Sequence, residues 1–343
     1  MTFIINTIVS ILVFTIVIMI HELGHFTVAK LSGIKVNEFS MGMGPRLFSI
    51  KRKETDYSLR AFPIGGFVAM EGEDEESDND RAFSKAPVQN RIAVVIAGAA
   101  MNLILGFGIL VFLVSQQDVI TSKTISQFHE NASTQQSGLM VNDEIISVNG
   151  RRCYIANDII YEFARTQNGT ADFVVRRDGK IVNVDNVLFQ TYKDENGMQQ
   201  LVIDFYVYPE EKTFLNVINE AAKWTMSLAR LIFLSLIDLV TGHVAINQMS
   251  GPVGIVSAIS EAASVGYQSV LMILALITVN VGVLNLVPFP ALDGGRLVFL
   301  LIELIRGKPI NQKYEIWVNS VGMIVLLGFM AFVTFSDITK LFM

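Results

Sequence analysis

The sequence predicts an α-helical polytopic membrane protein with about four transmembrane helices and an inserted α+β domain. Four long runs without Asp, Glu, Lys, Arg or His indicate the helices, and a polar segment between the second and third runs indicates the domain. A helix needs about 20 apolar residues to cross a ~30 Å hydrocarbon layer. All four runs reach that length, with 20, 26, 31 and 21 residues; they are Met1–Ile20, Ile92–Gln117, Ala262–Leu292 and Ile316–Ser336.

The composition agrees with a membrane protein. Hydrophobic residues make up 51% of the chain and charged residues 17%, whereas a soluble domain carries about 25% charged residues. The net charge of −6 argues against nucleic acid as the main partner, because nucleic-acid-binding surfaces are basic. The single cysteine, Cys153, excludes a disulfide framework, and we expect a packed thiol there.

We place the transmembrane helices at about 3–28, 92–115, 266–292 and 316–336. The first could instead be a cleaved signal peptide, but it lacks a basic N-terminal region and a small-residue cleavage site. Lys and Arg gather in the loops after the first and third helices, and the positive-inside rule places these loops in the cytoplasm. Both chain termini and the inserted domain then lie on the extracytoplasmic side.

The segment 118–210 reads as the inserted domain. Ser137–Gly150 contains a turn, a short apolar strand and an Asn-Gly hairpin signal. Helical spacing follows in Ile155–Arg165, and alternating strands flank Asp178-Gly179. The next segment, 211–248, contains an amphipathic helix that we expect on the membrane surface or against the helix bundle.

An H-E-x-x-H pattern ends the first run. The spacing places His21 and His25 on one helical face, where both can bind one metal ion, and Glu22 can take a proton from a water on that metal. The alternative is a pair of helix-end histidines at the membrane surface, although ionisable groups there are costly and usually functional. We expect His129 and His243 to be surface or loop residues outside the site.

A catalytic zinc needs a third protein ligand, and Asp293 is the first charge after the 31-residue run. Pro288 and Pro290 precede it and should break the helix, while Gly294 and Gly295 should allow tight turning. Broken backbone at membrane depth is tolerated where protein or a water-filled cavity surrounds it. The alternative is an ordinary helix end with Asp293 as the helix cap.

These residues resemble the site-2 protease family of intramembrane zinc metalloproteases, in particular the bacterial RseP-type members with a PDZ domain. The resemblance covers nearly the whole chain and rests on several short motifs. They are H-E-x-x-H at His21–His25, N-x-x-P-x-P-x-L-D-G at Asn285–Gly294, and G-x-x-x-N at Gly98–Asn102. Tyr57–Met70 resembles the family's membrane-reentrant β-hairpin, which we place at about 36–70. Ser137–Gly150 is similar to a single PDZ core, and Met249–Gly254 resembles a family segment.

The resemblance implies a zinc metalloendopeptidase of the bacterial cytoplasmic (inner) membrane that cleaves transmembrane segments of single-span membrane proteins. Anti-sigma factors or signal-peptide remnants would be its substrates. The implied roles are zinc binding by His21, His25 and Asp293, water activation by Glu22, and positioning of substrate or polar backbone by Asn102 and Asn285.

A substrate helix must unwind before hydrolysis, and the edge of the stretch 57–70 could hold it by strand addition. A plain cytoplasmic loop is the alternative for that stretch, and polar helix packing is the alternative for Asn102. The catalytic halves would be 1–117 and 249–343. A non-catalytic PDZ scaffold with a structural metal and a metal-ion transporter are the alternative functions, and the sequence leaves the substrate and oligomeric state open.

Overall fold

The computed structural model describes residues 2–73, 75, 77–166, 168–193, 199–241 and 251–341. The chain divides into two compact units: Met1–Ile109 with Leu228–Met343, and Leu110–Ser227. The second unit extends past 118–210 at both ends. It does so because Val114 near the end of one helix and Val217 near the start of another pack on Ile120.

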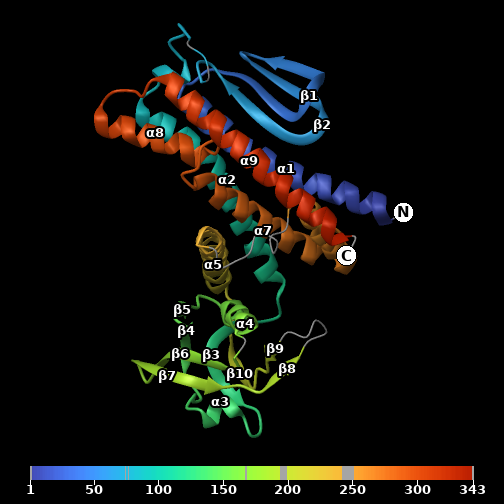
Figure 1. The fold of residues 1–343 in the computed structure, drawn as a ribbon, viewed down its shortest axis with the longest axis vertical. Coiled ribbons are helices and arrows are strands. Elements are labelled where there is room, and N and C mark those ends of the chain that lie inside the picture. Colours follow the sequence, from blue (N-terminus) through green and yellow to red (C-terminus); the bar gives the residue numbers. More distant parts are fainter. Residues whose placement is uncertain are drawn as a thin grey trace. The chain divides into compact units, whose positions relative to one another are not determined.

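Helices make up most of the first unit (Figure 1). They are α1 (Thr2–Leu31), α2 (Val88–Gln116, which continues into the second unit), α6 (Pro252–Val265), α7 (Tyr267–Leu286), α8 (Asp293–Arg306) and α9 (Gln312–Leu341). A short 3-10 helix, Phe83–Lys85, precedes α2. Four segments are long and apolar enough to cross a membrane, namely Ile5–Leu31, Val88–Gln116, Tyr267–Leu286 and Lys313–Lys340. This confirms the predicted polytopic membrane protein.

Small residues bring α2 close to its neighbours. A Cβ on Gly24 of α1 would lie 2.3 Å from the Ala97 carbonyl oxygen of α2. A Cβ on Gly282 of α7 would lie 3.0 Å from the Ala99 carbonyl oxygen, also on α2. Helices in a membrane approach this closely where the contact residues are small, so α2 packs tightly against both α1 and α7.

The third span is shorter than expected. The sequence predicted it at 266–292, whereas α7 ends at Leu286 and an irregular segment, 287–292, follows. Pro288 and Pro290 account for the break, because proline lacks the backbone N–H that continues a helix. The chain then becomes helical again at Asp293, where α8 begins.

The prediction that Gly294 and Gly295 form a tight turn was wrong, because these glycines serve close packing and not a turn. Both residues lie in α8, and the residue with a positive φ is Ala291, at +76°. A Cβ on Gly294 would lie 2.1 Å from the Val287 carbonyl oxygen, and one on Gly295 would lie 2.5 Å from that of Phe289. The glycines therefore let the first turn of α8 pack directly on the backbone of the irregular segment.

Residues 36–70 form a hairpin of two long strands, β1 (Val36–Arg52) and β2 (Thr55–Met70), which packs on α1 (Figure 1). The first half of β1 pairs with both ends of β2: Met41, for example, pairs with Leu59 and with Gly66. The Gly66–Met70 segment therefore has its β1 partner on one edge, and no described strand pairs with the other edge. The Thr15 hydroxyl of α1 donates to the Pro63 carbonyl at 3.1 Å.

The second unit contains an antiparallel sheet of order β10-β3-β4-β6-β7, with β5 paired to β4, and a separate β8-β9 pair. Its strands are β3 (Ile120–Phe128), β4 (Glu144–Val148), β5 (Arg151–Arg152), β6 (Thr170–Arg177), β7 (Lys180–Leu188), β8 (Thr191–Lys193), β9 (Gln199–Leu201) and β10 (Phe205–Glu210). Its helices are α3 (Ser133–Gln136), α4 (Ala156–Arg165) and the first part of α5 (Phe214–Val240). Phe163 of α4 packs on Phe173 of β6, 6.0 Å between ring centroids, and closes the apolar core of this α+β unit.

Candidate metal centre

Two imidazoles and one carboxylate converge in the first unit. His21 and His25 lie one turn apart on α1, and each is only 8% exposed. Their Nε2 atoms lie 3.1 Å apart. Asp293 Oδ2, from the first turn of α8, lies 3.1 Å from His21 Nε2 and 3.3 Å from His25 Nε2. The structure thus brings together the three residues that the sequence proposed as metal ligands.

The donor set fits a divalent cation. The three ligand atoms lie within 4.8 Å of one another, and no second group of this kind occurs among the described residues. Metal–ligand distances of about 2.0–2.2 Å in a tetrahedral site place ligand atoms about 3.3–3.6 Å apart, close to the distances between His21, His25 and Asp293. Asp293 Oδ2 is buried and accepts no hydrogen bond from any described residue.

The geometry does not support the helix-cap alternative for Asp293. The N-cap residue of α8 is Leu292, and the structure shows no side-chain hydrogen bond at that cap. The carboxylate instead lies beside the two imidazoles. Its position beside the two histidines fits a metal-ligand role.

One face of α2 lies against the two imidazoles. His25 Nδ1 lies 2.8 Å from the Val94 carbonyl oxygen and can donate to it. The Asn102 amide lies 3.4 Å from His21 Nδ1. With Nδ1 protonated and hydrogen-bonded, the lone pair of each ring stays on Nε2, where a metal would bind. The Val94 carbonyl therefore favours this tautomer of His25, whereas at His21 the Asn102 atom that faces Nδ1 is the amide nitrogen.

Gly98 lies on the same face of α2, midway between Val94 and Asn102, since the three are spaced four residues apart. A Cβ on Gly98 would lie 2.4 Å from His25 Nε2 and 2.8 Å from His21 Nε2. Real Cβ atoms do not approach other atoms so closely. Only glycine at this position leaves room for both rings.

Asn102 is fully buried, and His21 is the side chain to which its amide lies close. Its side-chain oxygen has no hydrogen-bond partner among the described residues in the recorded orientation. Turning the amide by 180° would direct that oxygen at His21 Nδ1, where it could accept the ring proton. The backbone carbonyl of Asn102 accepts a hydrogen bond from the Thr278 hydroxyl of α7 at 3.2 Å.

Glu22 is half-buried on α1 and lies near the Gly66–Met70 segment of β2. A Cβ added at Gly66 would lie 3.4 Å from Glu22 Cγ, so β2 passes close to this glutamate. Asn285 is half-buried in the last turn of α7, directly before the irregular segment. The sequence motifs contain both residues, but only the structure shows that β2 runs past Glu22.

A cleft of about 670 Å³ adjoins Asp293 and runs along α9. Its polar side chains include Arg296, Asn319 and Ser320, and Ile316 contributes to its apolar wall. The Arg296 guanidinium makes an ion pair with Glu73 and lies 3.6 Å from Glu315. The sequence analysis missed Asn319, although it is the one asparagine in the run Ile316–Ser336.

The remaining histidines and the cysteine lie elsewhere. His129 is exposed in the second unit, where its ring lies 4.7 Å from the ring of Tyr206. His243 falls outside the described residues. Cys153 is buried, and burial raises the pKa of its thiol to about 12, which fits a packed rather than a reactive thiol.

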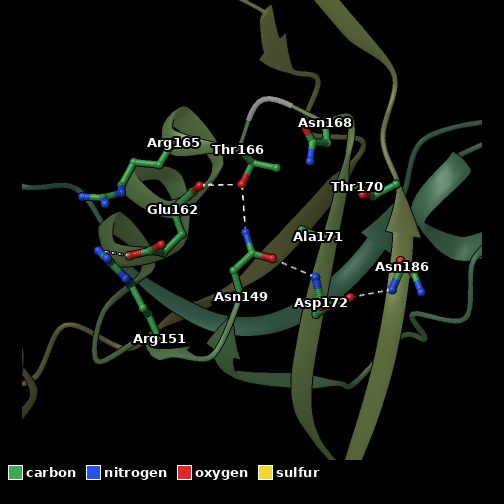
Figure 2. A pocket seen from close by; sticks show the side chains of 10 residues that line it. All are labelled: Asn149, Arg151, Glu162, Arg165, Thr166, Asn168, Thr170, Ala171, Asp172 and Asn186. Carbon is green, nitrogen blue, oxygen red and sulfur yellow. Dashed lines mark hydrogen bonds and ion pairs between the residues drawn. The ribbon is translucent and has the colours of Figure 1, made fainter. Parts of the chain in front are cut away.

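A polar pocket of about 510 Å³ lies in the second unit (Figure 2). Figure 2 shows that its side chains bond to one another: Asn149 donates to the Thr166 hydroxyl, and its oxygen accepts from the Asp172 backbone N–H. The Asp172 carboxylate accepts from the Asn186 backbone N–H at 2.7 Å. These bonds tie the turn after β4 to β6 and β7, so they explain the polar lining through the fold of the unit.

Comparison with known proteins places the whole chain among metal-dependent peptidases. The sequence profile of peptidase family M50 matches residues 9–329. A candidate zinc metalloprotease of Clostridium perfringens is 38% identical over 331 residues, covering 96% of this chain and 97% of the relative. The regulator of sigma-W protease RasP of Bacillus subtilis is 31% identical over 423 residues, covering 99% of this chain and 100% of the relative. Zinc metalloprotease RasP of Bacillus licheniformis is also 31% identical, over 422 residues, covering 98% of this chain and 100% of the relative.

Proposed function

The chain belongs to peptidase family M50, the site-2 protease family, and from this we propose that it is an intramembrane zinc endopeptidase that cleaves single-span membrane proteins. The observation that carries the proposal is the convergence of His21, His25 and Asp293 beside Glu22. Three protein ligands with a further position open to water is the pattern of catalytic rather than structural zinc sites.

Each residue of the centre has a defined task. Zinc, when bound, supplies a Lewis acid that polarises the scissile carbonyl and makes water acidic enough to attack near neutral pH. His21, His25 and Asp293 hold the metal. The Glu22 carboxylate accepts the proton of the attacking water and delivers it to the leaving amide nitrogen, so one group serves as base and then as acid.

The hairpin supplies a way to hold the substrate. An α-helix presents no free backbone for attack, so a transmembrane substrate has to unwind at the cleavage site. The edge of Gly66–Met70 that no described strand pairs with could bind the unwound segment by strand addition, next to Glu22. Asn285, at the end of α7, would then position the substrate or the polar backbone near the break.

The second unit is proposed to be a PDZ-like domain that filters substrates on the extracytoplasmic side. Its α+β composition and the short strand β4, which ends directly before Asn149-Gly150, agree with the PDZ core motif. The charge pattern of the loops supports a location in the bacterial cytoplasmic membrane with both termini extracytoplasmic. Anti-sigma factors or signal-peptide remnants are the proposed substrate types.

The test is cleavage of a single-span substrate by purified protein in proteoliposomes, measured together with bound zinc. Glu22→Gln should keep the zinc and lower cleavage by at least about 10²- to 10⁴-fold, the usual contribution of a general base. His21→Ala should lose both. Glu261→Gln, an exposed residue of α6, is the matched control and should lose neither. Undiminished cleavage by the Glu22→Gln protein would exclude this mechanism.

Two other functions give different results in the same experiment. A PDZ scaffold with a structural metal predicts no cleavage by the wild-type protein, and a closed site would need a fourth protein ligand, which the described residues do not supply. A metal-ion transporter predicts zinc flux into the liposomes that depends on Asp293.

A further inference from the structure

The irregular segment before Asp293 contains a residue in a conformation that its side chain disfavours. Ala291 has a φ of +76°, a region in which residues other than glycine are rare because Cβ crowds the backbone. Such a conformation persists where the surrounding structure holds it, and it is frequent at functional sites. Ala291 lies two residues before Asp293, so its backbone direction sets the start of α8.

Helix α9 holds this residue. The Ala291 backbone N–H donates a hydrogen bond to Asn319 Oδ1 at 3.3 Å. One turn further along α9, a Cβ on Gly322 would lie 2.4 Å from Pro290 Cβ and 2.6 Å from the Pro290 carbonyl oxygen. Asn319 and Gly322 are three residues apart and therefore share one face of the helix. That face of α9 lies directly against the backbone of Pro290 and Ala291.

The first turn of α8 contacts the same segment through its own backbone, at Gly294 and Gly295. The segment therefore lies between α8 and α9 with little room to move on either side. Within the described part of the chain, Asp293 is the one metal-ligand candidate that does not come from α1. A change in the backbone at Ala291 would displace its carboxylate while the two imidazoles stayed in place.

We propose that Asn319 is a positioning residue of the centre: by accepting the Ala291 N–H it holds the left-handed backbone that directs the Asp293 carboxylate at His21 and His25. The inference rests on the proposed function in one respect, namely that Asp293 binds zinc. It adds a contribution from the fourth span to a centre whose other parts come from α1, α2 and α8.

The test measures zinc affinity by chelator competition and the visible absorption of the Co²⁺-loaded protein, which reports ligand geometry. Asn319→Ala should weaken zinc binding about 10- to 100-fold, as is usual for a group that orients a ligand, and should change the Co²⁺ spectrum. Adding Ala291→Gly should restore most of the affinity, because glycine adopts a positive φ without Asn319. Thr334→Ala is the control, since the Thr334 hydroxyl bonds within α9, to Met330, and should leave both readouts unchanged.

A second variant covers the case in which the Asn319→Ala protein does not fold. Ala291→Val leaves Asn319 in place but disfavours the left-handed backbone, and it should weaken zinc binding to a similar degree. Wild-type zinc affinity in the Asn319→Ala protein with an altered KM would show that Asn319 contacts substrate instead, and would overturn the inference. So would a failure of Ala291→Gly to restore binding. If the wild-type protein binds no zinc that His21→Ala removes, the proposed function itself fails.

Discussion

The Gly98→Ala substitution tests whether the two imidazoles need the space that the missing Cβ of Gly98 leaves free. The added Cβ would lie 2.4 Å from His25 Nε2 and 2.8 Å from His21 Nε2, whereas comfortable contacts begin near 3.5 Å. At least one imidazole would have to withdraw by about 1 Å, while metal–ligand distances tolerate about 0.2 Å. A retreat of helix α2 would open its close contact with α1 at Gly24. We expect zinc content to fall at least about tenfold.

The assay is zinc per chain in detergent-purified protein, with cleavage measured in parallel. Gly108→Ala is the matched control: Gly108 lies on the same helix, and a Cβ there would meet nothing within 4 Å. Alanine favours a helix over glycine by about 1 kcal/mol, so neither change should unfold α2. Full zinc occupancy and wild-type cleavage in the Gly98→Ala protein would refute the packing argument.

Three other predictions follow from the structure. Asn102→Leu removes the side-chain oxygen that, with the amide turned, accepts the proton of His21 Nδ1, and it should weaken zinc binding about 10- to 100-fold. Asn102→Asp keeps an acceptor there and should bind zinc well; equal losses in chelator competition would contradict this. Cys153 should resist maleimide at neutral pH until the protein is denatured, because burial raises its pKa to about 12; rapid labelling of native protein would argue against that burial. Hydrogen bonds from the Arg81 and Lys30 side chains lower the Glu54 pKa to about 2, so this carboxylate stabilises the hairpin turn above pH 4.5 and loses that effect as the pH falls toward 2. The hydrogen-exchange protection factors of residues 50–56, which are corrected for the pH dependence of the intrinsic exchange rate, should then fall in that range in the wild type, but not in Glu54→Gln, whose turn is already loosened.

The helices that could span the membrane were predictable because each span requires a long run of uncharged, mostly apolar residues. An uncharged run such as Ile92–Gln117 has few alternatives to lipid, and α2 occupies nearly the same residues. Helix α8 was missed, although Leu297, Leu300 and Leu304 repeat at helical spacing. It follows the run directly, so the sequence analysis assigned its neighbourhood to the end of one span.

The proposed ligands were predictable because H-E-x-x-H fixes two side chains by spacing alone, and a lone charge after a long apolar run marks the third. Their supports were not. The Val94 carbonyl contacts His25. Because every residue has a backbone carbonyl, the residue type at position 94 does not indicate this contact. Ala291 was missed for a similar reason, since alanine does not indicate a positive φ. The sequence analysis assigned the turn to Gly294 and Gly295 instead.

The separation of the ligands along the chain bears on how the protein is made. His21 and His25 are synthesised before the inserted unit, and Asp293 follows only after the whole of that unit has been translated. Until α8 leaves the ribosome, the imidazole pair has no carboxylate partner. A nascent chain that ends before residue 293 therefore lacks one of the three proposed ligands. The order of synthesis thus completes the proposed metal centre only after the inserted unit has been made.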